Sequence, residues 1–425
     1  MASVQTQSAS VGEQLPAVNL KPLLTRLWPA GHPQPATAEE IAEAISHFFT
    51  NQVSDVQASS LLVGLHFTGL DRRADVLAKT ASVMLKAAAR IDATELQSVV
   101  EKRGRKEGGY NGGLCDIVGT GGDSHNTFNI STTSSILASS LLLVAKHGNK
   151  ASTSKSGSAD LLANMAPRPP QISRIRPDTI ARLYDETNYA FLFAPVFHPG
   201  MRHVAPIRKQ LPWRTVFNLV GPLANPVDLA SDPSSSASPL LEARMIGVAR
   251  KDLGPVFADA LRLGGSRKAL VVCGDEELDE VSCAGDTLCW RIAPAAGDEA
   301  VVEHFRLHPR DFGLPAHPLS TVSPGKEPAE NAAILAKILG GEVPDDDPIL
   351  HFVLINTAAL LVVSGICDSD TSDMGHGDDG VVITERGPGN GRWKEGVRRA
   401  KWAIKSGEAL RQWNKFVEVT NSFSE

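Results

Sequence analysis

Two segments rich in glycine and hydroxyl residues, each directly after a short apolar run, constrain the fold of this chain more than any other feature. The first follows 114–118 and reads Gly-Thr-Gly-Gly-Asp, then Asn-Thr-Phe-Asn-Ile-Ser-Thr; the second follows 141–144 and sets Lys146 and Lys150 among small polar residues. A strand, a glycine turn and a Ser/Thr-rich helix start form the usual phosphate site at a helix N-terminus. Glycines allow close backbone approach, and lysine adds positive charge. Together the segments predict a phosphate-bearing substrate.

Neither segment matches a common nucleotide-binding motif. No Gly-Lys-Ser/Thr triplet closes the first segment as in a Walker A loop, and the G-x-G-x-x-G spacing of dinucleotide-binding folds is absent. Either segment alone would be a weak signal, with a solvated polar loop as the alternative. The occurrence of two, each after a predicted strand, favours the binding of a polyanion.

The sequence predicts helices in the first part of the chain and an α/β arrangement after it. Capping-box patterns at Thr37 and Ser54 precede apolar residues at helical spacing, and a third amphipathic segment covers 71–91. From residue 114 onward, short apolar runs alternate with helical patterns, which is typical of a sheet covered by helices. We expect strands at 114–118, 141–144, 190–193, 245–248 and 269–272.

Composition sets broader limits. At 425 residues the chain exceeds the usual size of one hydrophobic core, so two domains are expected. The net charge of -6 argues against a general role in binding nucleic acid or a membrane surface. The five cysteines form no C-x-x-C pair, which favours a reducing compartment over a disulfide framework or a zinc site. No secretory signal pattern is visible, and the longest apolar stretch, 349–366, suits a buried helix, so we expect a soluble cytoplasmic protein.

Further motifs follow the two glycine-rich segments along the chain. They are Phe-Ala-Pro with Phe-His-Pro at 193–199, Arg-His at 202–203 with Arg208 beyond, Phe-Asn-Leu-Val-Gly-Pro-Leu-Ala-Asn-Pro at 217–226, and Leu-Asp-Glu-Val-Ser at 278–282. In this combination and order, the sequence resembles the anthranilate phosphoribosyltransferase family. The resemblance covers most of the chain, from about residue 20 to the C-terminal helices.

The resemblance implies an α/β protein with a small N-terminal helical domain and a large α/β domain, whose central mixed sheet is flanked by helices. We expect the helical domain to span 17–110, with a further contribution from about 178–215, and to form a homodimer. The domain that binds phosphoribosyl pyrophosphate would span 111–177 and 216–425. The implied reaction transfers the phosphoribosyl group to the amine of anthranilate and releases pyrophosphate, a step of tryptophan biosynthesis.

Such a reaction separates an anionic leaving group from an electron-deficient sugar carbon. It needs charge stabilisation and alignment, with no covalent nucleophile or strong base. The residues that match the family's site for phosphoribosyl pyrophosphate are Gly119, Gly122, Asp123, Thr127, Asn129, Ser131, Thr132, Lys146, Ser154 and Ser158. At 151–154 the sequence reads Ala-Ser-Thr-Ser where the family usually has Ser-Val-Ser-Ser, so Ala151 offers a backbone N–H but no hydroxyl.

The residues that match the family's anthranilate site are Gly119, His147, Asn149 and Arg208. Arg208 has the clearest chemistry, because a guanidinium fork binds a benzoate carboxylate through two parallel hydrogen bonds. A surface salt bridge is the alternative for this arginine. His147, like His198, could equally be a hydrogen-bonded histidine of the core.

Magnesium is the cofactor that the resemblance implies. Mg²⁺ is usually held by few protein oxygens, while substrate oxygens and waters complete its octahedron. Asp279 and Glu280, which follow the strand expected at 269–272, match the family's metal ligands together with Ser131. Two adjacent carboxylates are more often solvent-exposed groups of a loop than metal ligands. The acidic residues at 275–277 are further candidates for ligands of the metal.

Two other functions stay open on the sequence alone. A pyrimidine nucleoside phosphorylase shares the Lys-His-Gly-Asn and Gly-x-Ala-Asp signature at 146–149 and 157–160, but it would bind free phosphate and a nucleoside without magnesium. The motif at 217–226 and the acidic pair argue against it. A non-catalytic protein that binds nucleic acid or a partner through basic loops is disfavoured by the net negative charge.

Overall fold

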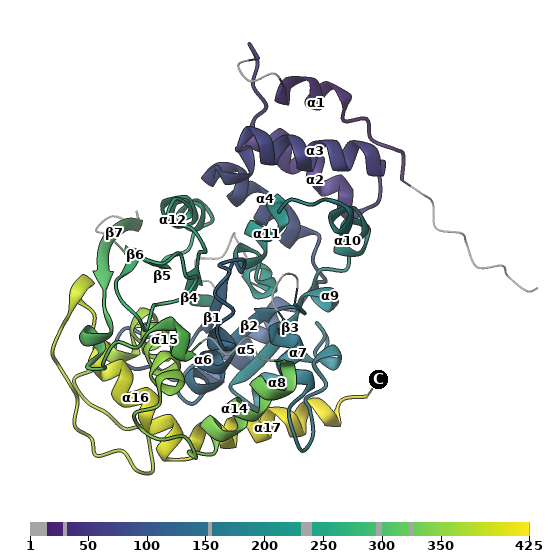
Figure 1. Ribbon diagram of the computed structural model, residues 1–425. Coiled ribbons are helices and arrows are strands. Elements are labelled where there is room, and N and C mark those ends of the chain that lie inside the picture. The colour runs from purple at the N-terminus through teal and green to yellow at the C-terminus, as the bar shows by residue number, and fades with distance from the viewer. Residues whose placement is uncertain are drawn as a thin grey trace, which may run out of the picture.

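The computed structural model describes residues 15–28, 32–151, 155–230, 240–294, 300–322 and 327–424. Ser154, one of the residues expected to bind phosphoribosyl pyrophosphate, lies outside these ranges. The chain forms a group of N-terminal helices that stands above an α/β body, with the long C-terminal helices at the far side of the sheet (Figure 1). The fold predicted from the sequence is thereby confirmed.

Among the described residues, five α-helices precede the first strand, and two of them start at the predicted capping signals. They are α1 (Lys21–Leu27), α2 (Ala38–Phe49), α3 (Asp55–Thr68), α4 (Ala74–Lys86) and α5 (Ala93–Arg103). Thr37 and Glu40 form a reciprocal capping box at α2, and the Ser54 hydroxyl accepts the N–H of Gln57 at α3. The amphipathic segment predicted at 71–91 is shorter in the structure, since Leu70–Arg72 form a separate 3₁₀ turn before α4.

A seven-stranded mixed sheet forms the centre of the α/β body, in the order β3-β2-β1-β4-β5-β6-β7. The strands are β1 (Leu114–Gly119), β2 (Leu143–Gly148), β3 (Tyr189–Phe193), β4 (Leu241–Gly247), β5 (Ala269–Gly274), β6 (Thr287–Pro294) and β7 (Ala300–Leu307). Neighbours from β3 to β5 pair in parallel, whereas β6 and β7 pair antiparallel. β6 and β7 were not predicted from the sequence; β7 alternates apolar with charged residues and is only half-buried.

Both faces of the sheet are covered. Leu270 and Val272 of β5 point into the core shared with the C-terminal helices, while Val271 and Cys273 point into the core shared with the N-terminal helices. This burial on both faces explains why the parallel strands read as continuous apolar runs. α4 packs against α12 (Leu253–Leu263), which joins the N-terminal helices to the sheet.

The remaining helices cover the sheet or connect its strands. They are α6 (Ile130–Ala138), α7 (Ser158–Ala163), α8 (Ile180–Glu186), α9 (Ala194–Phe197), α10 (Met201–Gln210), α11 (Val216–Val220), α13 (Leu319–Val322), α14 (Pro328–Leu339), α15 (Pro348–Ser364), α16 (Trp393–Lys405) and α17 (Glu408–Ser422). Within 178–215, β3 belongs to the sheet, and α10 packs against α2 and α3. α15 is the buried helix predicted at 349–366. Among the described residues, no helix combines the length and apolar character that crossing a membrane requires.

Candidate active site

The predicted site residues gather at the carboxyl ends of the parallel strands, beside β1. The chain runs from β1 outward to β2 and β3, then returns to β4 on the other side of β1, so the strand order reverses at this point. Ligands of open α/β sheets bind at such a reversal. Gly119 and Gly247 face each other here across β1 and β4, and a Cβ at either would overlap Asp279. Gly119 is among the site residues predicted from the sequence, whereas Gly247 is not.

The glycine loop after β1 is held against the acidic loop after β5. Gly121 and Gly122 adopt left-handed backbone conformations, with φ of 64° and 85°. The N–H of Gly121 donates to Asp279 Oδ2 at 2.6 Å, and His125 Nε2 lies 2.8 Å from the carbonyl oxygen of Glu276. These contacts join two segments that lie more than 150 positions apart in the chain.

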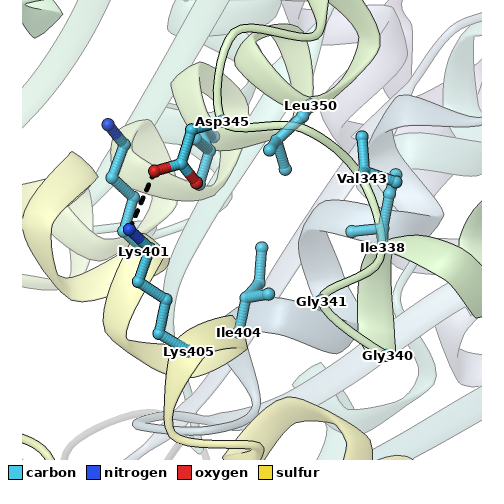
Figure 2. A pocket seen from close by; sticks show the side chains of 10 residues that line it. Ile338, Gly340, Gly341, Val343, Asp345, Leu350, Lys401, Ile404 and Lys405 are labelled. Atoms are coloured by element: carbon cyan, nitrogen blue, oxygen red, sulfur yellow. Dashed lines mark hydrogen bonds and ion pairs between the residues drawn. The ribbon is translucent and has the colours of Figure 1, made fainter.

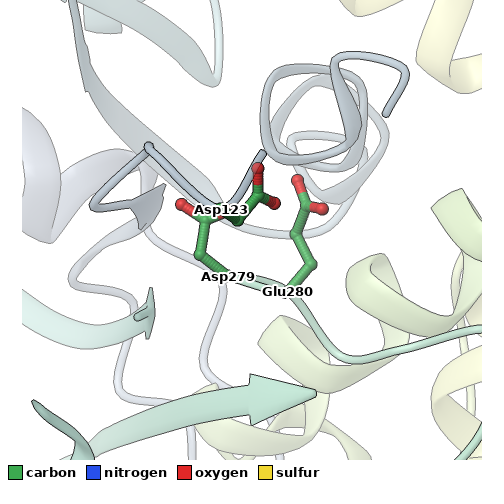
Figure 3. Close-up of side chains that lie close together, drawn as sticks. All are labelled: Asp123, Asp279 and Glu280. Carbon is green, nitrogen blue, oxygen red and sulfur yellow. The ribbon is translucent and has the colours of Figure 1, made fainter. Parts of the chain in front are cut away.

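Three carboxylates converge between these loops. One carboxylate oxygen from each of Asp123, Asp279 and Glu280 lies within 4.8 Å of the others (Figure 3). Burial, together with repulsion from Asp123, raises the pKa of Asp279, and burial with repulsion from Asp279 raises the pKa of Glu280. A cluster of hard oxygen donors that repel one another suits a divalent cation such as Mg²⁺.

The other acidic residues near this loop are engaged elsewhere. Asp275 pairs with Lys251 and Arg306, Glu276 accepts a hydrogen bond from the Ser282 hydroxyl, and Glu277 is exposed. The structure therefore separates Asp279 and Glu280 from the neighbouring acidic residues, which the sequence could not do. It also brings in Asp123, which the sequence analysis placed at the phosphates and not at the metal.

A buried lysine faces the carboxylate cluster from β2. Lys146 is only 2% exposed, and burial lowers its pKa while Asp116, Glu280 and Asp279 oppose that shift. Asp116 is equally buried and accepts a hydrogen bond from Asn225 at 2.9 Å. The lysine thus supplies a positive charge among acidic groups and remains available to a phosphate.

The residues predicted to bind phosphate lie around the start of α6. Ser131 and Thr132 are in its first turn, and no side chain of the described residues caps this helix, which leaves its N-terminal N–H groups available to an anion. The Asn129 amide donates to Ser156 Oγ at 3.1 Å, and Ser158 Oγ donates to the Asn149 carbonyl, also at 3.1 Å. The first of these bonds connects the two glycine-rich segments. Thr127 donates to Glu280 at 3.4 Å.

Two arginines face the site from the α10 side. Arg208 lies over the Phe217 ring, 5.8 Å from its centroid, and its guanidinium has no hydrogen-bond or ion-pair partner among the described residues. Burial and the neighbouring Arg214 lower its pKa. Arg214, which the sequence analysis missed, donates to the carbonyls of Gly121 and Thr120 at 2.7 and 2.8 Å. An unpaired, half-buried guanidinium beside a second one is a site for an anion.

Two histidines lie together behind the loops. The rings of His147 and His198 are 5.2 Å apart, and burial lowers the pKa of both, that of His198 to about 4. Both are therefore neutral near pH 7. His198 Nε2 lies 3.0 Å from the Ala224 carbonyl oxygen, whereas His147 Nε2 has no hydrogen-bond partner among the described residues. Nδ1 of His198 likewise has no hydrogen-bond partner among the described residues, so each ring keeps one nitrogen that could meet a ligand.

A cavity of about 310 Å³ lies apart from this site, between α14, α15 and α16 (Figure 2). Ile338, Leu350 and Ile404 line it, and Lys405 pairs with Asp345 at its edge at 2.9 Å. It shares no residue with the carboxylate cluster or the glycine-rich segments. We therefore assign the candidate site to the ends of the strands.

Comparison with known proteins places the chain in a family. Residues 21–88 match the helical bundle domain, and residues 111–410 the a/b domain, of the Glycosyl transferase family. An anthranilate phosphoribosyltransferase of Schizosaccharomyces pombe is 38% identical over 383 residues, which are 90% of this chain and 92% of that protein. That of Saccharomyces cerevisiae is 36% identical over 373 residues, 86% of each.

Solved structures agree with the sequence matches. The S. cerevisiae enzyme in complex with PRPP and Mg superposes with a TM-score of 0.76 at 32% identity, covering 95% of this chain and 98% of that one. The same enzyme with 4-fluoroanthranilate gives a TM-score of 0.73 at 30% identity, with the same coverage. The chain is a member of the anthranilate phosphoribosyltransferase family.

Proposed function

We propose that this chain transfers the phosphoribosyl group of phosphoribosyl pyrophosphate to the amine of anthranilate, giving N-(5-phosphoribosyl)anthranilate and pyrophosphate in tryptophan biosynthesis. The observation that carries the proposal is that three features lie together at one end of the sheet: an uncapped helix start, a buried lysine and three clustered carboxylates. The related S. cerevisiae enzyme has been solved with PRPP and Mg, and with 4-fluoroanthranilate.

The predicted site residues have different roles in binding phosphoribosyl pyrophosphate. The first turn of α6, with Asn129, Ser131 and Thr132, binds phosphate oxygens through N–H and hydroxyl groups. Lys146 neutralises part of the pyrophosphate charge. Gly119, Gly122, Thr127 and Ser158 shape the two loops around the sugar and its phosphates. Binding in this way aligns C1 of the sugar and stabilises the departing anion.

Asp123, Asp279 and Glu280 are the groups that would hold Mg²⁺, with the Ser131 hydroxyl as a further ligand. When bound, the cation neutralises charge that develops on the leaving pyrophosphate. The raised pKa values of Asp279 and Glu280 agree with this role, since a cation would relieve their repulsion.

Arg208 receives the anthranilate carboxylate, and His147 and Asn149 lie toward the same substrate. The unpaired guanidinium over Phe217 supports this assignment. An arylamine is neutral at cytoplasmic pH, so its nitrogen needs to be oriented and not deprotonated before attack. The neutral His147 fits that requirement, because a charged imidazole would oppose the positive charge that develops on the amine.

The alternative activity, phosphorolysis of a pyrimidine nucleoside, is less well supported. It leaves the three-carboxylate cluster without a use, because a phosphorylase binds free phosphate, which three clustered carboxylates repel in the absence of a cation. One assay separates the two activities. With Mg²⁺, phosphoribosyl pyrophosphate and anthranilate, we expect anthranilate fluorescence to disappear, and we expect no phosphorolysis of uridine or thymidine. Phosphorolysis without loss of anthranilate would refute the proposal.

We also propose that the N-terminal helices form a homodimer. α3 has apolar residues on both faces: Leu61 and Leu65 are buried, but Val56 is 75% and Phe67 58% exposed. The Phe67 ring meets that of the half-exposed Trp213 edge-on at 5.0 Å, which continues the apolar surface. Symmetric dimers are the commonest assembly, and they bury such surfaces.

The five cysteines are buried and free, which fits a location of the protein in the reducing cytoplasm.

The dimer is tested by placing a charge on this surface. Phe67→Glu should shift the protein from dimer to monomer in sedimentation velocity at micromolar concentration, because a buried unpaired carboxylate costs several kcal/mol. Val381→Glu changes an apolar side chain of similar exposure, 62%, in a different part of the structure, and should stay dimeric. A monomeric, fully active wild-type protein would contradict the proposal.

A further inference from the structure

A buried asparagine, Asn356, is hydrogen-bonded to the acidic loop that follows β5 and contains Asp279 and Glu280. Asn356 lies in the middle of α15, with none of its surface exposed, in a turn made largely of apolar residues. An amide in such a place costs free energy unless its polar atoms are hydrogen-bonded. All of its hydrogen bonds in the described structure are to backbone groups, which points to a role in fixing the chain.

The amide of Asn356 pairs with both polar backbone groups of one residue. The N–H of Val281 donates to Asn356 Oδ1 at 3.0 Å, and Asn356 Nδ2 donates to the Val281 carbonyl, also at 3.0 Å. Asn356 Nδ2 donates in addition to the Phe352 carbonyl of its own helix, at 3.1 Å. The side chain therefore binds the loop as a neighbouring β-strand would, at two points.

Val281 directly follows Glu280, so this contact governs where the two carboxylates lie. The Asp279 carboxylate is held by the N–H of Gly121. Among the described residues, the Glu280 carboxylate has only the long bond from Thr127, at 3.4 Å. Two like charges that repel each other would move apart if the backbone allowed it, and the backbone beyond Glu280 is anchored at Val281 by Asn356.

The same turn of α15 also contacts α6, the helix whose start is assigned to the phosphates. Ser134 of α6 donates to the Val353 carbonyl at 3.2 Å, three residues before Asn356. α6 begins with the residues assigned to the phosphates, so α15 sets the separation between the start of α6 and the acidic loop. Residues that hold metal ligands in place without contacting the metal affect the metal affinity, because they fix the orientation of the ligands.

We propose that Asn356 is a positioning residue for the metal site: by pairing with Val281, it holds Asp279 and Glu280 where, with Asp123, they bind a divalent cation. The inference rests on the proposed Mg²⁺-dependent transfer and names a residue that the sequence motifs did not include.

The test compares Asn356→Leu with Thr357→Val. Thr357 is equally buried, but in the described part of the chain its hydroxyl donates only to Val353 of its own helix, at 2.8 Å, so this control loses a buried hydrogen bond without touching the acidic loop. In Asn356→Leu, the Mg²⁺ concentration for half-maximal activity should rise on the order of ten- to a hundredfold. The dissociation constant of Mn²⁺, used as a probe with phosphoribosyl pyrophosphate and followed by electron paramagnetic resonance, should rise in parallel. Thr357→Val should change neither quantity.

A purely structural role would lower the thermal midpoint of both variants and leave both cation measurements unchanged, and that result would overturn the proposal. If the leucine variant does not fold, Asn356→Ser, whose hydroxyl is too short to pair with Val281, carries the same comparison. Loss of activity in every variant and in the wild type would refute the proposed function. The Mn²⁺ titration would still decide the role of Asn356 in that case.

Discussion

Asp279→Asn and Glu280→Gln are each expected to lower kcat by roughly a hundredfold or more, with a much smaller change in the KM of anthranilate. Both side chains belong to the three-carboxylate cluster, and each substitution removes one charged ligand while keeping the size of the side chain. The departing pyrophosphate is then less well neutralised, and this loss falls on the transition state. Steady-state kinetics at saturating Mg²⁺ measures the effect.

The same substitutions should stabilise the protein when no metal is present. The pKa of each carboxyl is raised in the folded state, so the folded chain binds these protons more tightly than the unfolded chain does. Stability is then lost as pH rises through the raised pKa, and it is regained at lower pH. In EDTA, the wild-type thermal midpoint should rise between pH 8 and pH 6, and the variants should show less of this rise.

Glu277→Gln is the matched control for both measurements. Glu277 is an exposed acidic residue two positions before Asp279, outside the cluster, and the substitution makes the same chemical change. It should leave kcat and the metal-free thermal midpoint unchanged. If Asp279→Asn and Glu280→Gln both kept the kcat of the wild type, the assignment of the cluster to the metal would be wrong.

Arg208→Ala is expected to raise the KM of anthranilate strongly and that of phosphoribosyl pyrophosphate little. Loss of one member of a partly desolvated charged pair costs ~2–5 kcal/mol, or roughly 30-fold and upward in kcat/KM. In the structure the guanidinium lies over Phe217 without an acidic partner among the described residues, so its removal should leave no carboxylate unpaired in the free enzyme. Arg208→Lys should restore activity only in part, because lysine keeps the charge but lacks the planar fork.

Aniline isolates the carboxylate contact from general damage to the site. Because it lacks the carboxylate, aniline should react equally poorly with the wild type and with Arg208→Ala. Arg202→Ala, an exposed arginine of the same helix, should behave as the wild type with both amines. If Arg208→Ala lost activity equally towards aniline and anthranilate, Arg208 would be structural and the amine site would lie elsewhere.

The sequence indicated features that depend on short stretches of chain. The capping signals at Thr37 and Ser54, and the buried helix at 349–366, follow from residues a few positions apart, and the structure has them. The strands of the parallel part were also recognised, because burial on both faces makes them continuously apolar. Their limits differ by a few residues, as for β2, which runs from Leu143 to Gly148, since Lys146 and His147 belong to the strand and not to the loop.

The edge of the sheet was harder to recognise from the sequence. β6 and β7 form an antiparallel hairpin whose outer strand is half in solvent, so polar residues interrupt the apolar pattern. The C-terminal segment forms two helices, α16 and α17, because Gly407, with φ of 75°, ends the regular backbone between them.

By itself, the sequence determined the kind of chemistry: glycine turns, hydroxyls and lysine after strands bind phosphate, and this follows from local backbone geometry. Only the tertiary structure decided which distant groups share the site. Asp123 joins Asp279 and Glu280, Arg214 covers the glycine loop, and Asn356 anchors the acidic loop, because strand order brings together segments far apart in the chain. Contacts of this kind depend on which strands are neighbours and on what is buried between them, and no spacing along the sequence encodes them.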